Sequence, residues 1–154
     1  MNGSAQQSYS PEGIAFTEVL FEVFRLYGRF LAEGDKLVQP FGLTTARWKV
    51  LGVISLASQP LTVPQIGRRI GLSRQNVQRL VDALEDDEFV ECRGNPDHKR
   101  AKLVALTAKG TQQYAAIMRK HIPWANQCAG GMERGDLDHT LRVIRQLIGQ
   151  LDRT

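Results

Sequence analysis

The sequence lacks most of what an enzyme or metal site requires. It contains only two cysteines in 154 residues, Cys92 and Cys128, too few for a zinc site or a disulfide framework. We expect both to be small buried apolar side chains. The sequence contains no nucleophile–base pairing, phosphate-binding loop or spaced set of metal ligands. It therefore favours a protein that is not an enzyme and that needs no metal or other cofactor.

Long apolar runs are missing as well. No run approaches the roughly 20 residues of a membrane helix. Residues 1–13 are polar and lack the apolar segment of a signal peptide. We expect no membrane partner, a cytoplasmic location and a flexible tail over residues 1–13. A hydrophobic content of 42% and a charged content of 23% are typical of one compact globular domain.

Charge is unevenly distributed along the chain, although the net charge is only +4. Four arginines and no acid lie between Pro64 and Val81, six acids and no base lie from Asp82 to Glu91, and five bases face a single acid from Arg93 to Lys109. Basic blocks set apart from acids suit a surface that faces phosphates. Chance clustering on a solvated surface would give the same pattern.

Three helix starts share one pattern, in which an apolar residue precedes a hydroxyl residue and a second apolar residue follows four positions later. The three examples are Leu43-Thr44…Trp48, Leu61-Thr62…Ile66 and Leu72-Ser73…Val77. The hydroxyl caps a free backbone N–H and the two apolar residues form a staple. The pattern predicts helices that begin near residues 45, 63 and 74, and Thr107 predicts the start of another.

The helices beginning near residues 63 and 74 are predicted to form a helix-turn-helix. Gly67 lets them approach closely, and Gly71 supplies the turn between them. Apolar residues fill the joint. Five polar side chains then face outward on the second helix, with groups suited to guanine and adenine edges in the major groove: Arg74, Gln75, Asn76, Gln78 and Arg79.

After residue 88 the period changes from helical to alternating. Residues 89–93 and 102–106 read as two short strands, and Gly94-Asn-Pro-Asp97 is a strong turn signal between them. A hairpin with a basic tip that directly follows the second helix of a helix-turn-helix is a winged helix. The expected fold is mainly α-helical, with this small β-hairpin as a wing.

Both ends of the chain lie outside the winged helix and need a partner surface. Residues 14–38 form a predicted helix with one broad apolar face, and residues 137–151 carry a heptad seam. Packing within the chain would account for so short a seam, but we favour a homodimer. The predicted regions are a dimerisation helix over 14–42, the winged helix over 43–106 and dimerisation helices over 107–154. The predicted interface residues are Phe16, Leu20, Leu137, Leu141, Ile144, Ile148 and Leu151.

Two stretches of the chain are specific enough to identify a family, Gly71-Leu-Ser-Arg-Gln-Asn-Val77 and Asn95-Pro-Asp-His-Lys-Arg-Ala-Lys-Leu-Val-Ala-Leu-Thr-Ala-Lys-Gly110. With them, the chain resembles the MarR family of bacterial transcriptional regulators from about Ile14 onward. The resemblance implies a homodimer that binds double-stranded DNA at pseudopalindromic operators, with repression as the expected output. It also implies release by a small, often phenolic, ligand or by cysteine oxidation. The family's peroxide sensors carry their reactive cysteine in the first helix, where this chain has none.

The resemblance also implies roles for single residues. The five polar residues of the second helix match the face that reads the major groove, and Arg100 matches a wing arginine that enters the minor groove. Many relatives place an aspartate two residues before that arginine, whereas this chain has His98 there and Asp97 one place earlier. Whether either orients Arg100 is open. Contacts with phosphate are expected from Ser73, Arg68, Arg69, His98, Lys99 and Lys102.

Two questions stay open at this level. Tyr27, Phe30 and Trp48 are candidates for a pocket that binds a small aromatic effector, although aromatic residues at helical spacing are more often core. A winged helix that binds another protein, without sequence-specific binding of DNA, is the alternative function.

Overall fold

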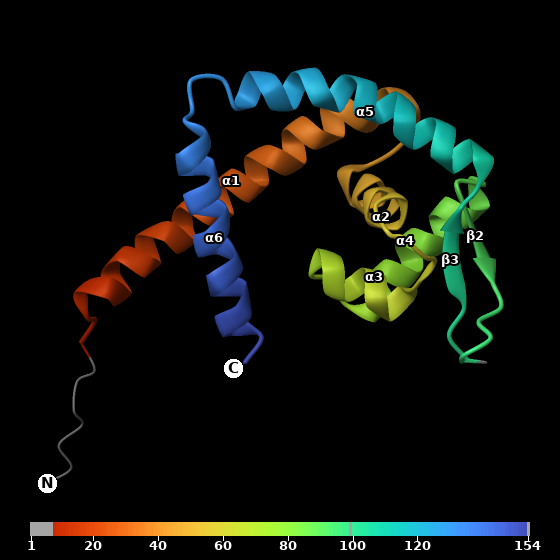
Figure 1. Ribbon diagram of the computed structural model, residues 1–154, viewed down its shortest axis with the longest axis horizontal. Coiled ribbons are helices and arrows are strands. Elements are labelled where there is room, and N and C mark those ends of the chain that lie inside the picture. The colour runs from red at the N-terminus through yellow and green to blue at the C-terminus, as the bar shows by residue number, and fades with distance from the viewer. Residues whose placement is uncertain (1–7, 99, 154) are drawn as a thin grey trace, which may run out of the picture. The chain divides into compact units, whose positions relative to one another are not determined.

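The computed structural model describes residues 8–98 and 100–153, which are mostly helical with a small antiparallel sheet (Figure 1). This confirms the predicted fold class, a winged helix-turn-helix with additional helices. The elements in chain order are α1 (Pro11–Val38), the short 3-10 helix η1 (Gln39–Phe41), α2 (Thr45–Ser55), β1 (Leu61–Thr62), α3 (Val63–Ile70), α4 (Arg74–Asp86), β2 (Val90–Arg93), β3 (Leu103–Leu106), α5 (Ala108–Cys128) and α6 (Arg134–Leu151).

The chain forms two compact units, divided within α5 between Ile117 and Met118. The first unit holds the elements from α1 to the first half of α5, and the second holds the rest of α5 and all of α6. The functional regions that the sequence predicts, with boundaries at residues 42 and 106, stay a prediction.

Side-chain caps fix where the helices of the first unit begin. The hydroxyl of Thr44 accepts a hydrogen bond from the backbone N–H of Arg47 at 3.4 Å, and that of Ser73 accepts one from Asn76 at 3.3 Å. The backbone N–H of Thr62 donates to Oε1 of Gln65 at 2.8 Å. The predicted starts near residues 45, 63 and 74 are therefore confirmed.

Helix α1 begins earlier than the sequence analysis predicted. The hydroxyl of Ser10 accepts a hydrogen bond from the backbone N–H of Gly13 at 3.0 Å, and Pro11 occupies the first helical position. Proline is well tolerated there because its missing N–H would have had no partner. The predicted tail over residues 1–13 is therefore wrong for residues 11–13, and residues 1–7 lie outside the described residues.

The sheet joins the wing to the helix-turn-helix. Strand β3 lies in the middle and pairs antiparallel with β2 on one side and with β1 on the other. Strands β2 and β3 form the predicted wing hairpin, one residue shorter at one end of each strand than expected. The sequence analysis missed β1, whose Leu61 pairs with Val104 and whose Thr62 pairs with Leu103.

The core of the first unit lies between α2, α3, α4 and the sheet. Fully buried side chains include Leu51 of α2, Ile66 of α3, Leu84 of α4 and Val104 of β3. Gly67 lies so close to the turn that an added Cβ would be 2.7 Å from the carbonyl oxygen of Leu72. Gly71 has a φ of 68° in that turn, a conformation that glycine adopts without steric cost. Both glycines therefore have the roles that the sequence predicts.

The second unit buries much less surface. Helix α6 contains no buried residue, and its Leu137, Leu141 and Ile144 are all exposed. Within the part of the chain that the structure describes, no helix is both long and apolar enough to cross a membrane.

Candidate nucleic-acid interface

Helix α4 presents one exposed polar face and one buried apolar face. The buried face consists of Val77, Val81 and Leu84. The five residues that the sequence predicts to face outward are all exposed: Arg74, Gln75, Asn76, Gln78 and Arg79. The helix therefore projects these side chains away from the core, as a helix that enters the major groove must do.

Two hollows flank this face of α4. On one side, Arg74 and Gln78 line a groove of about 370 Å³ together with Arg100 and Lys102 of the wing. On the other side, Asn76 and Arg79 line a second hollow with Ala46 at the start of α2. The predicted site residues thus separate into a wing side and an α2 side.

Hydrogen bonds along α4 pair some of these side chains. Nη2 of Arg79 donates to Oδ1 of Asn76 at 2.6 Å, and Nε2 of Gln78 donates to Oδ1 of Asp82 at 2.7 Å. Asn76 therefore fixes one end of the Arg79 guanidinium, whose other N–H groups stay available to a ligand.

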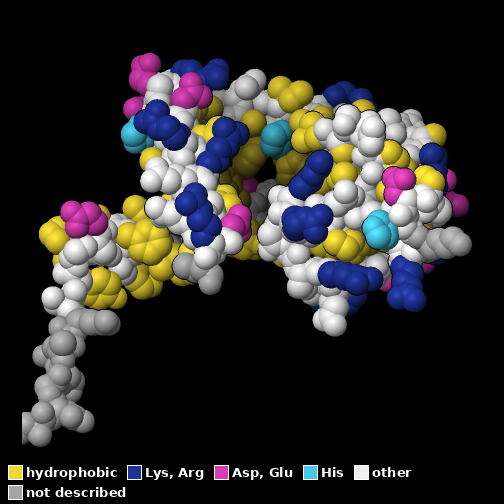
Figure 2. Space-filling model, turned by 60° about the horizontal axis from the view of Figure 1, so that its bottom comes forward, with side chains coloured by type: hydrophobic (Ala, Val, Ile, Leu, Met, Phe, Trp, Pro, Cys, Tyr) yellow, Lys and Arg dark blue, Asp and Glu magenta, His cyan; other side chains and the backbone are white. Residues whose placement is uncertain are grey.

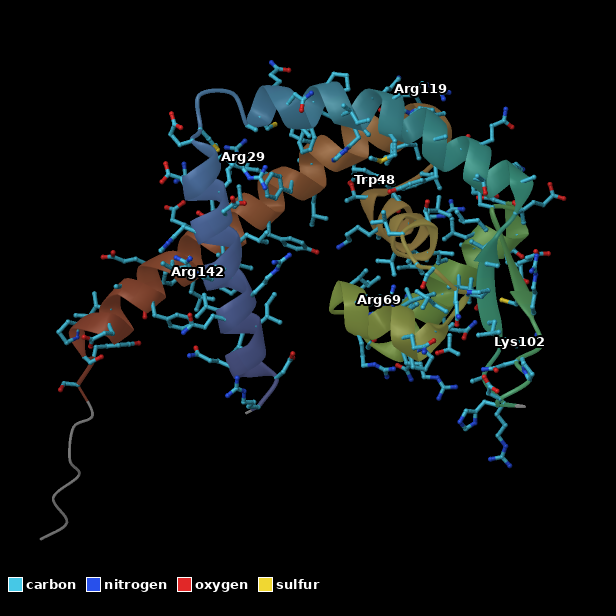
Figure 3. All side chains as sticks on the ribbon, viewed as in Figure 1. Arg29, Trp48, Arg69, Lys102, Arg119 and Arg142 are labelled. Carbon is cyan, nitrogen blue, oxygen red and sulfur yellow. The ribbon has the colours of Figure 1, made fainter. Side chains whose placement is uncertain are left out.

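The cations of this surface differ in whether a carboxylate neutralises them. Arg47, Arg93 and Lys109 form ion pairs with Asp87, Glu91 and Glu88. Across residues 8–98 and 100–153, by contrast, no ion pair engages the predicted phosphate- and base-contacting cations Arg68, Arg69, Arg74, Arg79, Arg100 and Lys102. Figure 2 shows Lys and Arg side chains gathered on the face of the helix-turn-helix and wing turned toward the viewer, and Figure 3 labels Arg69 and Lys102 there.

The tip of the wing is a tight turn. The backbone N–H of Asp97 donates to Oδ1 of Asn95 at 3.0 Å, and that of Ala101 donates to the carbonyl of His98 at 3.1 Å. In the described part of the wing, neither Asp97 nor His98 forms a side-chain hydrogen bond or ion pair with Arg100. Lys99, a predicted phosphate contact, lies outside the described residues.

Arg47 holds the C-terminal end of α4, a role that the sequence analysis missed. Nη2 of Arg47 donates to the carbonyl of Ala83 at 2.9 Å and also bonds the carboxylate of Asp87. The Arg47 side chain is only 16% exposed. Its hydrogen bond and charge lower the pKa of Asp87 below the ordinary value. An arginine that binds the last carbonyls of a helix also complements the helix dipole.

The turn after α4 is held by the start of α5. The hydroxyl of Thr107 donates to the carbonyl of Glu88 at 2.6 Å and accepts from the backbone N–H of Gly110 at 2.9 Å. Glu88 itself has a φ of 61°. Gly110 lies against the same turn, since an added Cβ would be 1.8 Å from the carbonyl oxygen of Phe89.

The two cysteines differ in exposure. Cys92 is half-buried beside the groove, and burial together with the nearby carboxylate of Glu85 raises its pKa, which disfavours the reactive thiolate. Cys128 is exposed, so the expectation that both are buried is wrong for that residue. It is the last residue of α5.

The aromatic candidates for effector binding lie on α1 and α2. Tyr27 and Phe30 are about half exposed, at 51% and 49%. Nζ of Lys49 lies 5.5 Å from the centre of the Tyr27 ring. Trp48 packs against the core of the first unit (Figure 3). An effector site at these residues stays a prediction.

Comparison with known proteins agrees with the geometry of this surface. The sequence model of the MarR family matches residues 41–101, which span α2, the helix-turn-helix and most of the wing. The uncharacterized protein Rv2011c of Mycobacterium tuberculosis is 36% identical over 127 residues, which are 82% of this chain and 87% of that protein. The chain belongs to the MarR family.

Two further proteins extend the comparison. The transcriptional activatory protein BadR of Rhodopseudomonas palustris is 25% identical over 138 residues, covering 88% of this chain and 79% of BadR. The crystal structure of a MarR/EmrR family transcriptional regulator from Acinetobacter sp. ADP1 superposes with a TM-score of 0.81, at 23% identity, over 90% of this chain and 97% of that one. The protein is thus a MarR-family winged-helix transcriptional regulator of the DNA-binding class.

Proposed function

We propose that this MarR-family regulator binds a pseudopalindromic operator as a homodimer and represses transcription until a small aromatic ligand releases it. The observation that carries the proposal is the exposed face of α4 beside the wing. Its cations have no ion-pair partner among the described residues. Cations without a carboxylate partner attract phosphates and release counterions from DNA on binding.

The apolar faces of α1 and α6 support the homodimer, each considered within its own unit. Only Gly34 and Val38 of the 28 residues of α1 are buried, while large side chains such as Phe16 and Leu20 are 42% and 37% exposed. On α6, Leu141 and Ile148 are 43% and 54% exposed. Apolar stripes of this length on a water-facing helix mark an interaction surface. A second copy of the chain is the partner that the resemblance to the family implies.

Each proposed half-site is read by one α4 and one wing. Gln75, Asn76 and Arg79 face the base edges of the major groove, and Arg100 enters the adjacent minor groove. Ser73, Arg68, Arg69, Lys99 and Lys102 contact phosphates. In a two-fold dimer of this kind the half-sites lie about one helical turn, roughly 34 Å, apart. DNA binding also implies a cytoplasmic location.

The proposals for the ligand and for repression or activation are supported by similar proteins. One structural neighbour, CouR from Rhodococcus jostii RHA1, is bound to p-coumaroyl-CoA, and a Staphylococcus aureus MarR is in complex with salicylate and kanamycin. Each of these two proteins is bound to an aromatic ligand, p-coumaroyl-CoA or salicylate, which supports an aromatic effector here. BadR is named an activatory protein, so activation is the second candidate for the output.

Selection of genomic fragments by the purified protein tests the proposal. We expect recovery of a palindromic sequence, binding that weakens steeply as salt rises, and repression of a reporter placed behind that sequence. Stimulation of the reporter would favour activation. Failure to bind any genomic fragment would favour the winged-helix module that binds protein.

Removal of α6 tests the homodimer. A chain that ends after Gly131 lacks the whole seam and should lose the dimer in light scattering coupled to gel filtration. A dimer that survives this truncation would contradict the assignment of α6 to the interface. The matched control is Arg134→Ala, which alters an exposed ion pair on α6 and should leave the dimer intact.

A further inference from the structure

The groove between α4 and the wing suggests a more specific assignment, which rests on the proposed binding of DNA. Arg74 is the first residue of α4, and Arg100 and Lys102 precede β3 on the wing. All three line the same groove of about 370 Å³. The groove therefore separates the helix assigned to the major groove from the wing assigned to the minor groove.

A DNA strand must pass over such a groove. The major and minor grooves of B-DNA share a sugar–phosphate strand as their border, and the two grooves are only about 12 and 6 Å wide. A protein that places one element in each groove therefore straddles that strand. The side chains between the two elements face its phosphates and not the base edges.

The composition of the groove suits a phosphate. Three of its lining side chains are cations and none is a carboxylate. Its floor includes the buried residues Val63 and Val104. Two acids lie close enough to influence Cys92 of this lining, and both accept hydrogen bonds. Asp82 accepts from Gln78, and Glu85 accepts from the backbone N–H of Cys92 at 2.9 Å.

Arg74 and Arg79 differ in their surroundings although both belong to α4. Arg79 lines the opposite hollow, and Asn76 holds its guanidinium in one orientation. Such bracing suits the bidentate recognition of guanine. The Arg74 side chain has no hydrogen-bond or ion-pair partner in the described part of the chain, and it lines the same groove as Arg100 and Lys102.

We propose that this groove binds a backbone phosphate of the operator through Arg74 and Lys102. Arg100 lies at the wing end of this groove, next to the minor groove that the DNA strand borders. Arg74 is then a phosphate-binding residue that contributes affinity without sequence preference. The pattern of the sequence had assigned it to base reading.

The test compares full-length Arg74→Ala with Arg79→Ala, two variants of α4 that each remove one positive charge from an exposed position. Fluorescence anisotropy would measure their affinity for the operator and for a scrambled duplex of equal length. Arg134→Ala on α6 is the control for the loss of one charge. Matched circular dichroism spectra would establish that all variants are folded.

Arg74→Ala should weaken binding to both duplexes by the same factor. With two copies per dimer, the slope of log affinity against log salt should become shallower by about 1.8, twice the 0.9 expected for each lost phosphate contact. Arg79→Ala should weaken operator binding about fivefold to a hundredfold and weaken the scrambled duplex much less. An Arg74→Ala loss that is confined to the operator and alters base preference would overturn the proposal.

Operators with a single uncharged methylphosphonate locate the contact. At one backbone position between the two grooves, the neutral linkage should weaken the wild-type protein but not Arg74→Ala. If every methylphosphonate that weakens binding of the wild-type protein also weakens binding of Arg74→Ala, Arg74 contacts no phosphate and the assignment fails. The proposed function fails in a different way, by an absence of operator binding in the wild-type protein itself.

Free phosphate could supply the same chemistry, so it is measured separately. Thermal unfolding of the protein without DNA is measured in inorganic phosphate and in chloride at equal ionic strength. The change of midpoint between the two salts should be the same for wild type and for Arg74→Ala. Stabilisation by phosphate that disappears in Arg74→Ala would assign the groove to a free phosphate-bearing molecule and overturn the assignment to the DNA backbone.

Discussion

Gly110 offers a sharp test of how α5 holds the turn after the recognition helix α4. In Gly110→Ala, the new Cβ would lie 1.8 Å from the carbonyl oxygen of Phe89 and 2.8 Å from its carbonyl carbon. Both atoms belong to the backbone, so no side-chain rotation relieves the contact. The turn must move away from α5. Two hydrogen bonds from Thr107 to the turn lengthen with it, that of its hydroxyl to the carbonyl of Glu88 and that of its backbone N–H to the carbonyl of Phe89.

The expected loss of stability follows from these contacts. Overpacking costs about 1–3 kcal/mol, and two weakened hydrogen bonds add about 1 kcal/mol each. A total of about 3–5 kcal/mol corresponds to a fall of roughly 6–20 °C in Tm for a chain of this size. Thermal unfolding followed by circular dichroism measures this, at one protein concentration because the Tm of a dimer depends on it.

Gly135→Ala is the matched control, at an exposed position of α6 that precedes the proposed dimer seam. No heavy atom lies within 4 Å of the Cβ that it would add, so alanine should be neutral or should stabilise the helix by up to about 1 kcal/mol. The same Tm for Gly110→Ala and wild type would refute the tight contact between α5 and the turn. A large loss in Gly135→Ala would show that the space around a glycine does not predict the cost.

Two further predictions concern the same end of α4. Arg47 lowers the pKa of Asp87 in the folded chain, so the pair stabilises the fold fully above the unfolded value of about 3.9 and loses this effect as the pH falls toward the folded pKa. The free energy of unfolding, measured in urea, should therefore fall less for Asp87→Asn than for wild type between about pH 5 and pH 2. An equal fall in the two proteins would contradict this. Glu88→Gly should be about 1 kcal/mol more stable than Glu88→Ala, because the φ of 61° at this position costs glycine less than alanine. Both variants lose the exposed ion pair with Lys109, so equal unfolding midpoints would argue against strain at Glu88.

Local signals made much of the first unit predictable. The caps at Thr44, Thr62 and Ser73 act within three residues, so the sequence alone contains both partners of each bond. The start of α1 was equally local. Ser10 followed by Pro11 is a cap and a first helical residue, but the polar composition of residues 1–13 led to the prediction of a tail.

Long-range contacts could not be predicted in the same way. Strand β1 has two residues and exists only because Leu61 and Thr62 meet β3, more than 40 positions later. Arg47 bonds Asp87 across 40 positions, and no local pattern in the sequence indicates that these two residues form a pair. The separation of Arg74 from Arg79 depends on where the wing folds back. Periodicity places both on one exposed face, whereas the fold puts Arg100 and Lys102 beside Arg74 and the start of α2 beside Arg79.

The central position of β3 has a consequence for chimeric regulators. The wing strand pairs through Val104 with both Cys92 of β2 and Leu61 of β1, and β1 runs directly into the capped start of α3. A wing transplanted from a relative as a hairpin alone would bring one edge of β3 that had evolved against a different β1. Exchanges of wing specificity among such proteins should therefore carry the residues of β1 along with the hairpin, because the strand that supports the wing also sets the first turn of the helix-turn-helix.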